Sequence, residues 1–335
     1  MTQRLRLSEA VPKFLLHLQA CNLAPTTIDG YRSTLALFAR VTGDLRLDSI
    51  RAEHVDAVFN HYHWAQSTRN IRIGQFRAFF TWARGAKHMS YASNPMVGRR
   101  YGTVPDKQRI RIPHAEWPRL FEACVHPQER IVVATGLYLF LRASEQKDLR
   151  LHQVNLQDNV VELWRRKTKK WQTMPIVTEL DHELRIWLTY LSENYSPTPD
   201  SHLVCAQNRT TFKDPVTGRW ASGTGTLDLS RPMHSPALAV QRILRRAGYT
   251  FDKYTGEHTL RRSGARALFD SLVDQGYDGA LRQVQTMLGH KSSSQTEVYI
   301  GIDLDQKKVL QAFAGKPMFA RVSANVMPLR EVVRG

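Results

Sequence analysis

In its C-terminal third, the 335-residue chain carries the stretch Glu257-His258-Thr259-Leu260-Arg261-Arg262. His258 and Arg261 are three residues apart, so a helix would place both side chains on one face. An imidazole beside a fixed cation supplies a proton acceptor next to a site for negative charge, which a phosphate under attack requires. Because such pairs are also common on ordinary helix surfaces, neighbouring motifs must decide whether this one is catalytic.

Two further candidate groups follow this stretch. His290 comes directly after Gly289, a residue type that favours a turn at a helix end. Tyr299 follows nine residues later and carries a phenol that can act as a nucleophile. A lone His or Tyr is usually a packing residue, so it is the order of the three motifs that indicates a catalytic site.

The order His-x-Leu-Arg, Leu-Gly-His and Thr-x-x-Tyr resembles the second catalytic box of the tyrosine recombinases, the phage integrase family. Upstream, Leu141-Arg142-x-Ser144-Glu145 resembles the first box of that family and directly follows the apolar run 131–141, a predicted helix. The resemblance implies that Arg142 clamps the scissile phosphate. Phe140 departs from the family pattern, which usually has Gly at this position.

A basic segment, residues 165–170, separates two β-prone runs at 159–164 and 172–176. This pattern predicts a hairpin with a solvated tip. The resemblance implies that the hairpin carries a catalytic lysine, and the spacing Lys-x-x-Lys-x-x-x-x-Pro aligns Lys167 with it. Lys169 and Lys170 remain rivals because a run of cations blurs the register.

Composition favours a polyanionic partner. The chain has a net charge of +17 and a pI near 10.1, which predicts binding to nucleic acid through the phosphate backbone. The mean hydropathy is −0.39, and no apolar run approaches the ~20 residues of a membrane span. The amino terminus lacks the apolar stretch of a signal peptide, so we expect a cytoplasmic protein of a bacterial cell, associated with DNA and not with a membrane.

Residues 1–97 predict a helical bundle. Ser8 is the expected cap of the first helix, Thr26 or Thr27 caps the second, and a fourth helix near 68–84 should bury Ile71. The bundle resembles the SAM-like core-binding domain of the same family. Expected DNA contacts lie on this domain, in the basic linker 98–113 and at the hairpin tip: Arg69, Arg72, Arg77, Arg99, Arg100, Arg109, Arg111, Lys169 and Lys170.

The implied fold is mainly α-helical with a small antiparallel sheet, forming a C-shaped clamp on DNA. Residues 114–315 would form the catalytic domain. Within it, residues 196–232 carry little periodicity and predict a surface insertion. Residues 316–335 form a tail that is either exchanged between subunits or packed on its own domain.

By the resemblance, Tyr299 attacks a phosphate to give a 3′-phosphotyrosyl link. His258 accepts the phenol proton, Arg142 and Arg261 hold the phosphate, Lys167 protonates the leaving oxygen, and His290 adds a hydrogen bond. No metal or other cofactor is implied. The expected partners are double-stranded attachment or recombination sites, three further copies in a homotetramer on two duplexes, and a directionality factor or host DNA-bending protein.

Integration or excision of a phage or mobile element is the expected role, and a Xer-like dimer resolvase is the main alternative. A type IB topoisomerase uses related chemistry but usually lacks this amino-terminal pattern, and a protelomerase-like resolvase is usually longer. A non-catalytic DNA-binding protein is the alternative from another class, against which the complete six-residue set argues.

Overall fold

The computed structural model describes residues 5–89, 94–104, 111–166, 168–208, 211–213, 220–222, 225–249 and 256–302. It divides into two units, residues 1–107 and 108–335. The division falls inside the predicted linker 98–113. Each unit has its own hydrophobic core.

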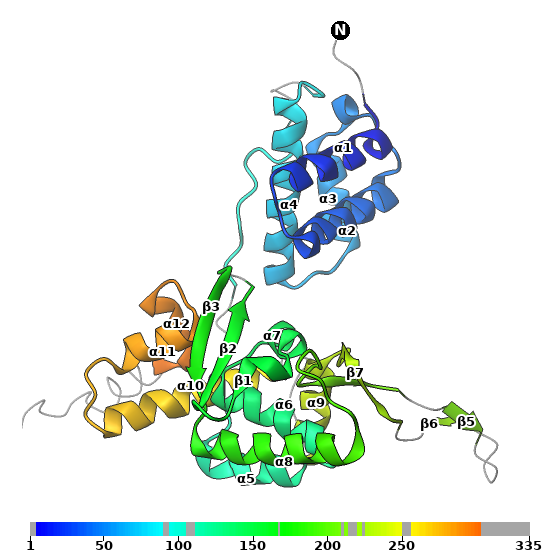
Figure 1. The fold of residues 1–335 in the computed structure, drawn as a ribbon. Helices are drawn as coiled ribbons and strands as arrows, with labels where there is room; N and C mark the ends of the chain where they lie inside the picture. Colours follow the sequence, from blue (N-terminus) through cyan, green and yellow to red (C-terminus); the bar gives the residue numbers. More distant parts are fainter. Residues whose placement is uncertain are drawn as a thin grey trace, which may run out of the picture. The chain divides into compact units, whose positions relative to one another are not determined.

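The amino-terminal unit is a bundle of helices (Figure 1). Its described helices are α1 (Leu7–Ala20), α2 (Pro25–Thr42), the short η1 (Leu47–Ser49), α3 (Ala52–His61) and α4 (Gln66–Gly85). Buried phenylalanines from α1, α2 and α4 form the centre, and Phe14–Phe79 and Phe38–Phe76 both meet edge to face at 5.3 Å between ring centroids. Because aromatic rings bury large areas, these contacts account for much of the driving force for folding.

Three local expectations for this unit were wrong. Ser8 lies inside α1, where its hydroxyl and N–H both donate to the carboxylate of Asp44, at 2.9 Å each. The second helix begins at Pro25, whose fixed φ suits the first helical turn, and neither threonine caps it. Ile71 is 59% exposed, because Ile73 and Phe76 occupy the buried face of α4.

The carboxy-terminal unit is built on two buried helices, α6 (Pro127–Tyr138) and α10 (Glu257–Asp274). Around them pack η3 (His114–Glu116), α5 (Trp117–Glu122), α7 (Ala143–Asp148), η4 (Leu151–Gln153), α8 (Thr178–Asn194), α9 (Pro236–Arg246), α11 (Ala280–Leu288) and α12 (Ser293–Ile300). Helix α6 is buried without interruption from Ile131 to Leu137, because it is covered on several sides.

The predicted hairpin is present as β2 (Val160–Arg165) and β3 (Lys170–Pro175), joined by β1 (Val154–Asn155) into an antiparallel sheet of order β1-β2-β3. The segment 196–232, predicted as a surface insertion of little periodicity, contains β4 (Cys205–Gln207), β5 (Thr211–Lys213), β6 (Trp220–Ser222) and β7 (Leu227–Pro232). β4 pairs with β7, and Leu203, Val204 and Cys205 are fully buried. The mainly helical fold with small antiparallel sheets is confirmed.

Helices α6 and α10 approach closely at a glycine. A Cβ atom on Gly264 would stand 1.7 Å from the carbonyl oxygen of Leu137, which belongs to the backbone of α6. We therefore expect Gly264→Ala to force the two helices apart and to lower the free energy of unfolding by about 2 kcal/mol or more. Denaturant unfolding followed by circular dichroism measures this change.

Gly85→Ala is the matched control, because a Cβ there meets no heavy atom within 4 Å. Alanine is the better helix former, so this variant should be neutral or up to about 1 kcal/mol more stable. Equal effects of the two substitutions would contradict the close helix contact.

Candidate active site

His258 and Arg261 occupy the first turns of α10 and share a face, as their spacing predicts. Arg261 is 1% exposed, and its guanidinium donates to the carbonyl oxygens of Phe140 and of Leu288, the latter at 2.6 Å. Burial lowers the pKa of Arg261 to about 10, so the group stays cationic at neutral pH. A fixed positive charge therefore stands beside the His258 imidazole.

Arg142 reaches the same site from a chain reversal. Helix α6 ends at Tyr138, three residues earlier than the predicted run, and Arg142 is the N-cap of α7. Between them Phe140 has φ 52°, in the left-handed region that glycine adopts at least cost. The departure from the family's Gly thus falls on a strained residue, and that turn aims the Phe140 carbonyl at Arg261.

Glu145 is the carboxylate that organises these cations, and sequence reasoning gave it no role. It is 4% exposed and forms ion pairs with Arg142 and Arg165 at 2.8 Å, and with Arg261 at 3.7 Å. Burial opposes its ionisation, but the three guanidinium groups and the Arg142 N–H together lower its pKa below the usual value.

Arg165 was predicted to lie in a solvated hairpin tip, and this was wrong. It is 2% exposed, because β2 turns this side chain inward beside Leu163 and toward Glu145. Side chains alternate between the two faces of a strand, and this alternation was the one signal that could have predicted a buried Arg165. The run of cations around Arg165 concealed it.

His290 and Tyr299 complete the site from α11 and α12. Gly289 has φ 65° and ends α11 in a left-handed turn, as expected, so that His290 follows directly. The His290 ring meets the Tyr299 ring edge to face at 5.2 Å, and its Nδ1 lies 3.1 Å from the buried Thr296 hydroxyl. The hydroxyl of Tyr299 is buried and has no hydrogen-bond partner among the described residues.

Two of the predicted site residues, Arg142 and Arg261, lie close enough to Tyr299 to shift the pKa of its phenol. Burial raises the pKa of its phenol, while the charges of Arg261, Arg262 and Arg142 act in the opposite direction. His258 is exposed to solvent. Its pKa is nevertheless lowered, first by desolvation from the atoms around it and then by the charges of Arg261, Arg262 and Arg142. The Tyr299 phenol can donate a proton and the neutral His258 imidazole can accept one, and the guanidinium groups around them can hold an anion.

Several predicted residues receive no such placement. Lys167, Arg109 and the tail 316–335 lie outside the described residues. Lys169 and Lys170 are exposed at the hairpin tip. Arg111 lies in the carboxy-terminal unit and donates to the Ile300 carbonyl at 2.6 Å.

Three of the amino-terminal arginines that we expect to contact DNA are half-buried on α4. Arg69 stacks over Phe59 at 4.7 Å, Arg72 lies over Trp64 at 5.6 Å, and Arg77 lies over Tyr101 at 4.8 Å. These contacts arise because the guanidinium plane packs on aromatic faces that also cover the core.

Two further arginines expected to contact DNA lie just beyond the bundle. Arg99 is paired with Asp56 at 2.9 Å, and the neighbouring Arg100 is exposed. The beginning of the predicted linker therefore packs on the amino-terminal unit.

Comparison with known proteins decides the family. The Phage integrase family profile matches residues 111–305, and the profile of the phage integrase N-terminal SAM-like domain matches residues 11–87. The chain belongs to the phage integrase family. The resemblance carried by the catalytic motifs is thus confirmed.

Relatives with curated names are recombinases. A tyrosine recombinase XerC of Chromobacterium violaceum is 23% identical over 89% of this chain and 91% of its own length. A tyrosine recombinase XerD of Ralstonia nicotianae is 27% identical over 87% and 88%, respectively. These members of the family match this chain along nearly its whole length.

Solved structures share the fold. A lambda integrase dimer bound to a COC′ core site superimposes with a TM-score of 0.67, 15% identity and coverage of 89% of this chain and 78% of the other. The XerH recombinase bound to palindromic difH gives a TM-score of 0.64, 15% identity and coverage of 88% and 82%. At this identity the likeness establishes the fold alone.

The described part of the chain shows neither a metal-binding cluster nor a membrane-spanning helix. There, no group of three or more His, Cys, Asp or Glu side chains is arranged to hold a metal ion. Over the same residues, no helix combines the length and apolarity needed to cross a bilayer.

Glu257 adds a titratable group that the sequence motif did not reveal. It is 6% exposed, one of its carboxyl oxygens has no described partner, and burial raises its pKa from 4.5 to about 8 against the effect of Arg261. The folded protein therefore keeps a proton that the unfolded chain loses. The stability gained is fully present below pH 4.5 and is lost as the pH rises through 8.

Glu257→Gln replaces the carboxyl with an amide of similar shape that is uncharged at every pH. Its stability relative to the wild type should rise by about 2 kcal/mol between about pH 5 and about pH 8.5. Urea unfolding at the two pH values measures this difference, and Glu122→Gln, at an exposed position, is the reference for loss of one carboxylate. Parallel stability curves for wild type and Glu257→Gln would contradict the raised pKa.

Proposed function

We propose that this protein is a site-specific DNA recombinase that cuts and rejoins DNA through a 3′-phosphotyrosyl intermediate. The observation that carries the proposal is that Arg142 and Arg261 act on both the Tyr299 phenol and the His258 imidazole, in a chain that belongs to the phage integrase family. Its role is integration or excision of a phage or mobile element.

In the cleavage step, the Tyr299 oxygen attacks the scissile phosphorus as His258 accepts the phenol proton. A phenol with a raised pKa is a weak nucleophile, so acceptance of its proton by the neutral His258 imidazole contributes directly to the rate. The bond between phosphorus and the 5′-oxygen breaks, and Lys167 gives that oxygen its proton. Because the phosphotyrosyl link conserves the ester, a 5′-hydroxyl can later reverse the reaction and join a new strand.

The developing negative charge is held by cations fixed before the substrate arrives. Arg261 is locked by two backbone carbonyls, and Arg142 is locked by Glu145 at 2.8 Å. Preorganised donors of this kind cost no reorganisation during reaction and commonly contribute ~10²–10³-fold in rate. His290 adds a hydrogen bond to the phosphate.

Double-stranded DNA is the substrate, bound by basic side chains of both units. Arg69, Arg72, Arg77, Arg99 and Arg100 serve this purpose on the amino-terminal unit, with Arg109, Arg111, Lys169 and Lys170 on the remainder of the chain. The half-buried arginines would exchange aromatic or carbonyl contacts for phosphate oxygens. Salt should weaken binding steeply, since released counterions drive it.

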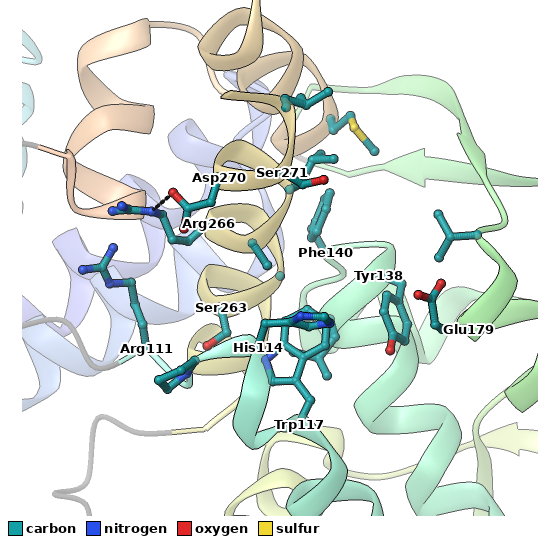
Figure 2. Close-up of a pocket in the computed structure, with 18 of the residues that line it drawn as sticks. Arg111, His114, Trp117, Tyr138, Phe140, Glu179, Ser263, Arg266, Asp270 and Ser271 are labelled. Carbon is teal, nitrogen blue, oxygen red and sulfur yellow. Dashed lines mark hydrogen bonds and ion pairs between the residues drawn. The ribbon is translucent and has the colours of Figure 1, made fainter. Parts of the chain in front are cut away.

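Four copies act on two duplexes, joined by a directionality factor or a host DNA-bending protein at complex sites. A cavity of about 1000 Å³ in the carboxy-terminal unit offers an acceptor for the tail 316–335 of a neighbouring copy (Figure 2). Trp117, Leu137 and Phe140 line it with apolar surface. The tail supplies matching residues: Met318, Phe319, Val322, Val326, Met327, Leu329, Val332 and Val333.

Resolution of chromosome or plasmid dimers is the second candidate role, because the curated relatives are named XerC and XerD. Sequencing the DNA junctions made beside candidate attachment sites separates the two roles. Integration requires two different sites, whereas dimer resolution joins two copies of one site.

Tyr299→Phe removes one oxygen atom and should abolish covalent attachment while leaving DNA affinity nearly unchanged. A duplex nicked close to the scissile phosphate traps the wild-type protein as an adduct that survives SDS, and gel electrophoresis measures it. Tyr277→Phe, at an exposed position, should form the adduct normally. An adduct with Tyr299→Phe would overturn the assignment and direct the search to Tyr249 and Tyr254.

Truncation after Gly315 tests the exchange of the tail. The shortened protein should keep its circular dichroism spectrum and its binding to a half-site, but lose cooperative assembly of a synaptic complex in gel-shift assays. Loss of folding in the isolated monomer would instead show that the tail packs on its own domain.

A further inference from the structure

Arg165 joins three elements at the base of the hairpin. Its guanidinium donates to Glu145 Oε2 at 2.8 Å, to Gln172 Oε1 at 2.8 Å and to the Met287 carbonyl at 2.9 Å. These partners belong to α7, β3 and α11. A planar guanidinium has its donors in a fixed geometry, so the three elements are held in one arrangement.

The last turn of α11 receives donors from two sides. Gln172 donates to the Thr286 carbonyl at 3.1 Å, Arg165 to that of Met287, and Arg261 to that of Leu288. The Thr286 carbonyl also accepts the Gly289 N–H at 3.0 Å. Carbonyls in the last turn of a helix lack the usual helical partner, and cations there also complement the helix dipole. The β2–β3 hairpin and Arg261 are thus both hydrogen-bonded to the helix end that leads into His290.

Arg165 has no surface left for the substrate. It is 2% exposed, and all three of its nitrogen atoms donate to protein acceptors. It therefore differs from Arg142, whose side chain is 25% exposed beside the same carboxylate. Arg165 acts on the reaction only through the groups that it holds.

We propose that Arg165 is a positioning residue for DNA cleavage, which fixes the base of the β2–β3 hairpin against Glu145 and the end of α11 so that the hairpin lysine meets the leaving 5′-oxygen. This rests on the proposed function, in which Lys167 protonates that oxygen. Lys167 follows Arg165 by two residues. A displaced hairpin base would therefore slow the proton transfer more than the attack by Tyr299.

A change of leaving group distinguishes slower proton transfer from slower attack by Tyr299. When the bond between the Tyr299 oxygen and phosphorus forms, the bond from phosphorus to the 5′-oxygen breaks, and that oxygen takes a proton from the Lys167 ammonium. An alkoxide is a poor leaving group because the pKa of a hydroxyl lies near that of water, ~16. A thiol has a pKa of ~8.5, so sulfur in the bridging 5′ position leaves as a thiolate without that proton.

The experiment compares two nicked suicide duplexes, one with the natural bridging oxygen and one with bridging sulfur, in single-turnover adduct formation at saturating protein. With oxygen, Arg165→Met should react about 100-fold more slowly than the wild type. With sulfur, it should react within about fivefold of the wild type. Arg165→Lys reaches only one of the three acceptors at a time, and should show the same pattern with a smaller loss.

Arg166→Met is the matched control, because Arg166 is the exposed neighbour and pairs with Asp148 at the surface. It removes the same charge from the hairpin and should stay within about threefold of the wild type on both duplexes. The positioning role would be overturned if Arg165→Met and Arg165→Lys were each slowed to the same extent on the oxygen and sulfur duplexes. It would also be overturned if neither variant were slowed on the oxygen duplex. Absence of any wild-type adduct would instead contradict the proposed function itself.

Discussion

The buried carboxylate of Glu145 is the interaction on which the site depends. Three guanidinium groups surround it, from Arg142, Arg165 and Arg261, and none of these cations could be placed so close to the others without it. Burying one charge is costly, and the cost is offset here only because the carboxylate is paired on every side. The surplus of positive charge that remains is what a phosphate diester would neutralise.

The fold supplies the rigidity that this charge arrangement needs. Gly264 lets α10 lie against the backbone of α6, which fixes the helix that carries His258 and Arg261. The strained turn at Phe140 then directs a carbonyl oxygen at Arg261. The end of α11 completes the frame, since the carbonyls of Thr286, Met287 and Leu288 accept in turn from β3, β2 and α10. Preorganisation therefore comes from backbone acceptors as much as from side chains.

Two groups at the site are poised in their less reactive forms. Burial raises the pKa of Tyr299 and keeps its phenol neutral, and burial raises the pKa of Glu257 and keeps its carboxyl neutral at pH 7. A neutral Glu257 does not repel an incoming phosphate, while an ionised one would. The balance of charge at the site is thus set by desolvation as well as by the motif residues.

The sequence alone determined the family and the mainly helical fold, because motif spacing and helical periodicity are local properties of the chain. It also predicted that His258 and Arg261 share a helix face and that Gly289 ends a helix. Only the tertiary structure decided which cations are buried. Arg165 looks like its neighbours in the basic run, and Ser8 looks like a helix cap, until Glu145 and Asp44 approach from elsewhere in the chain. Partners distant in sequence fix the burial and the pKa of a charged group, so no local pattern can reveal them.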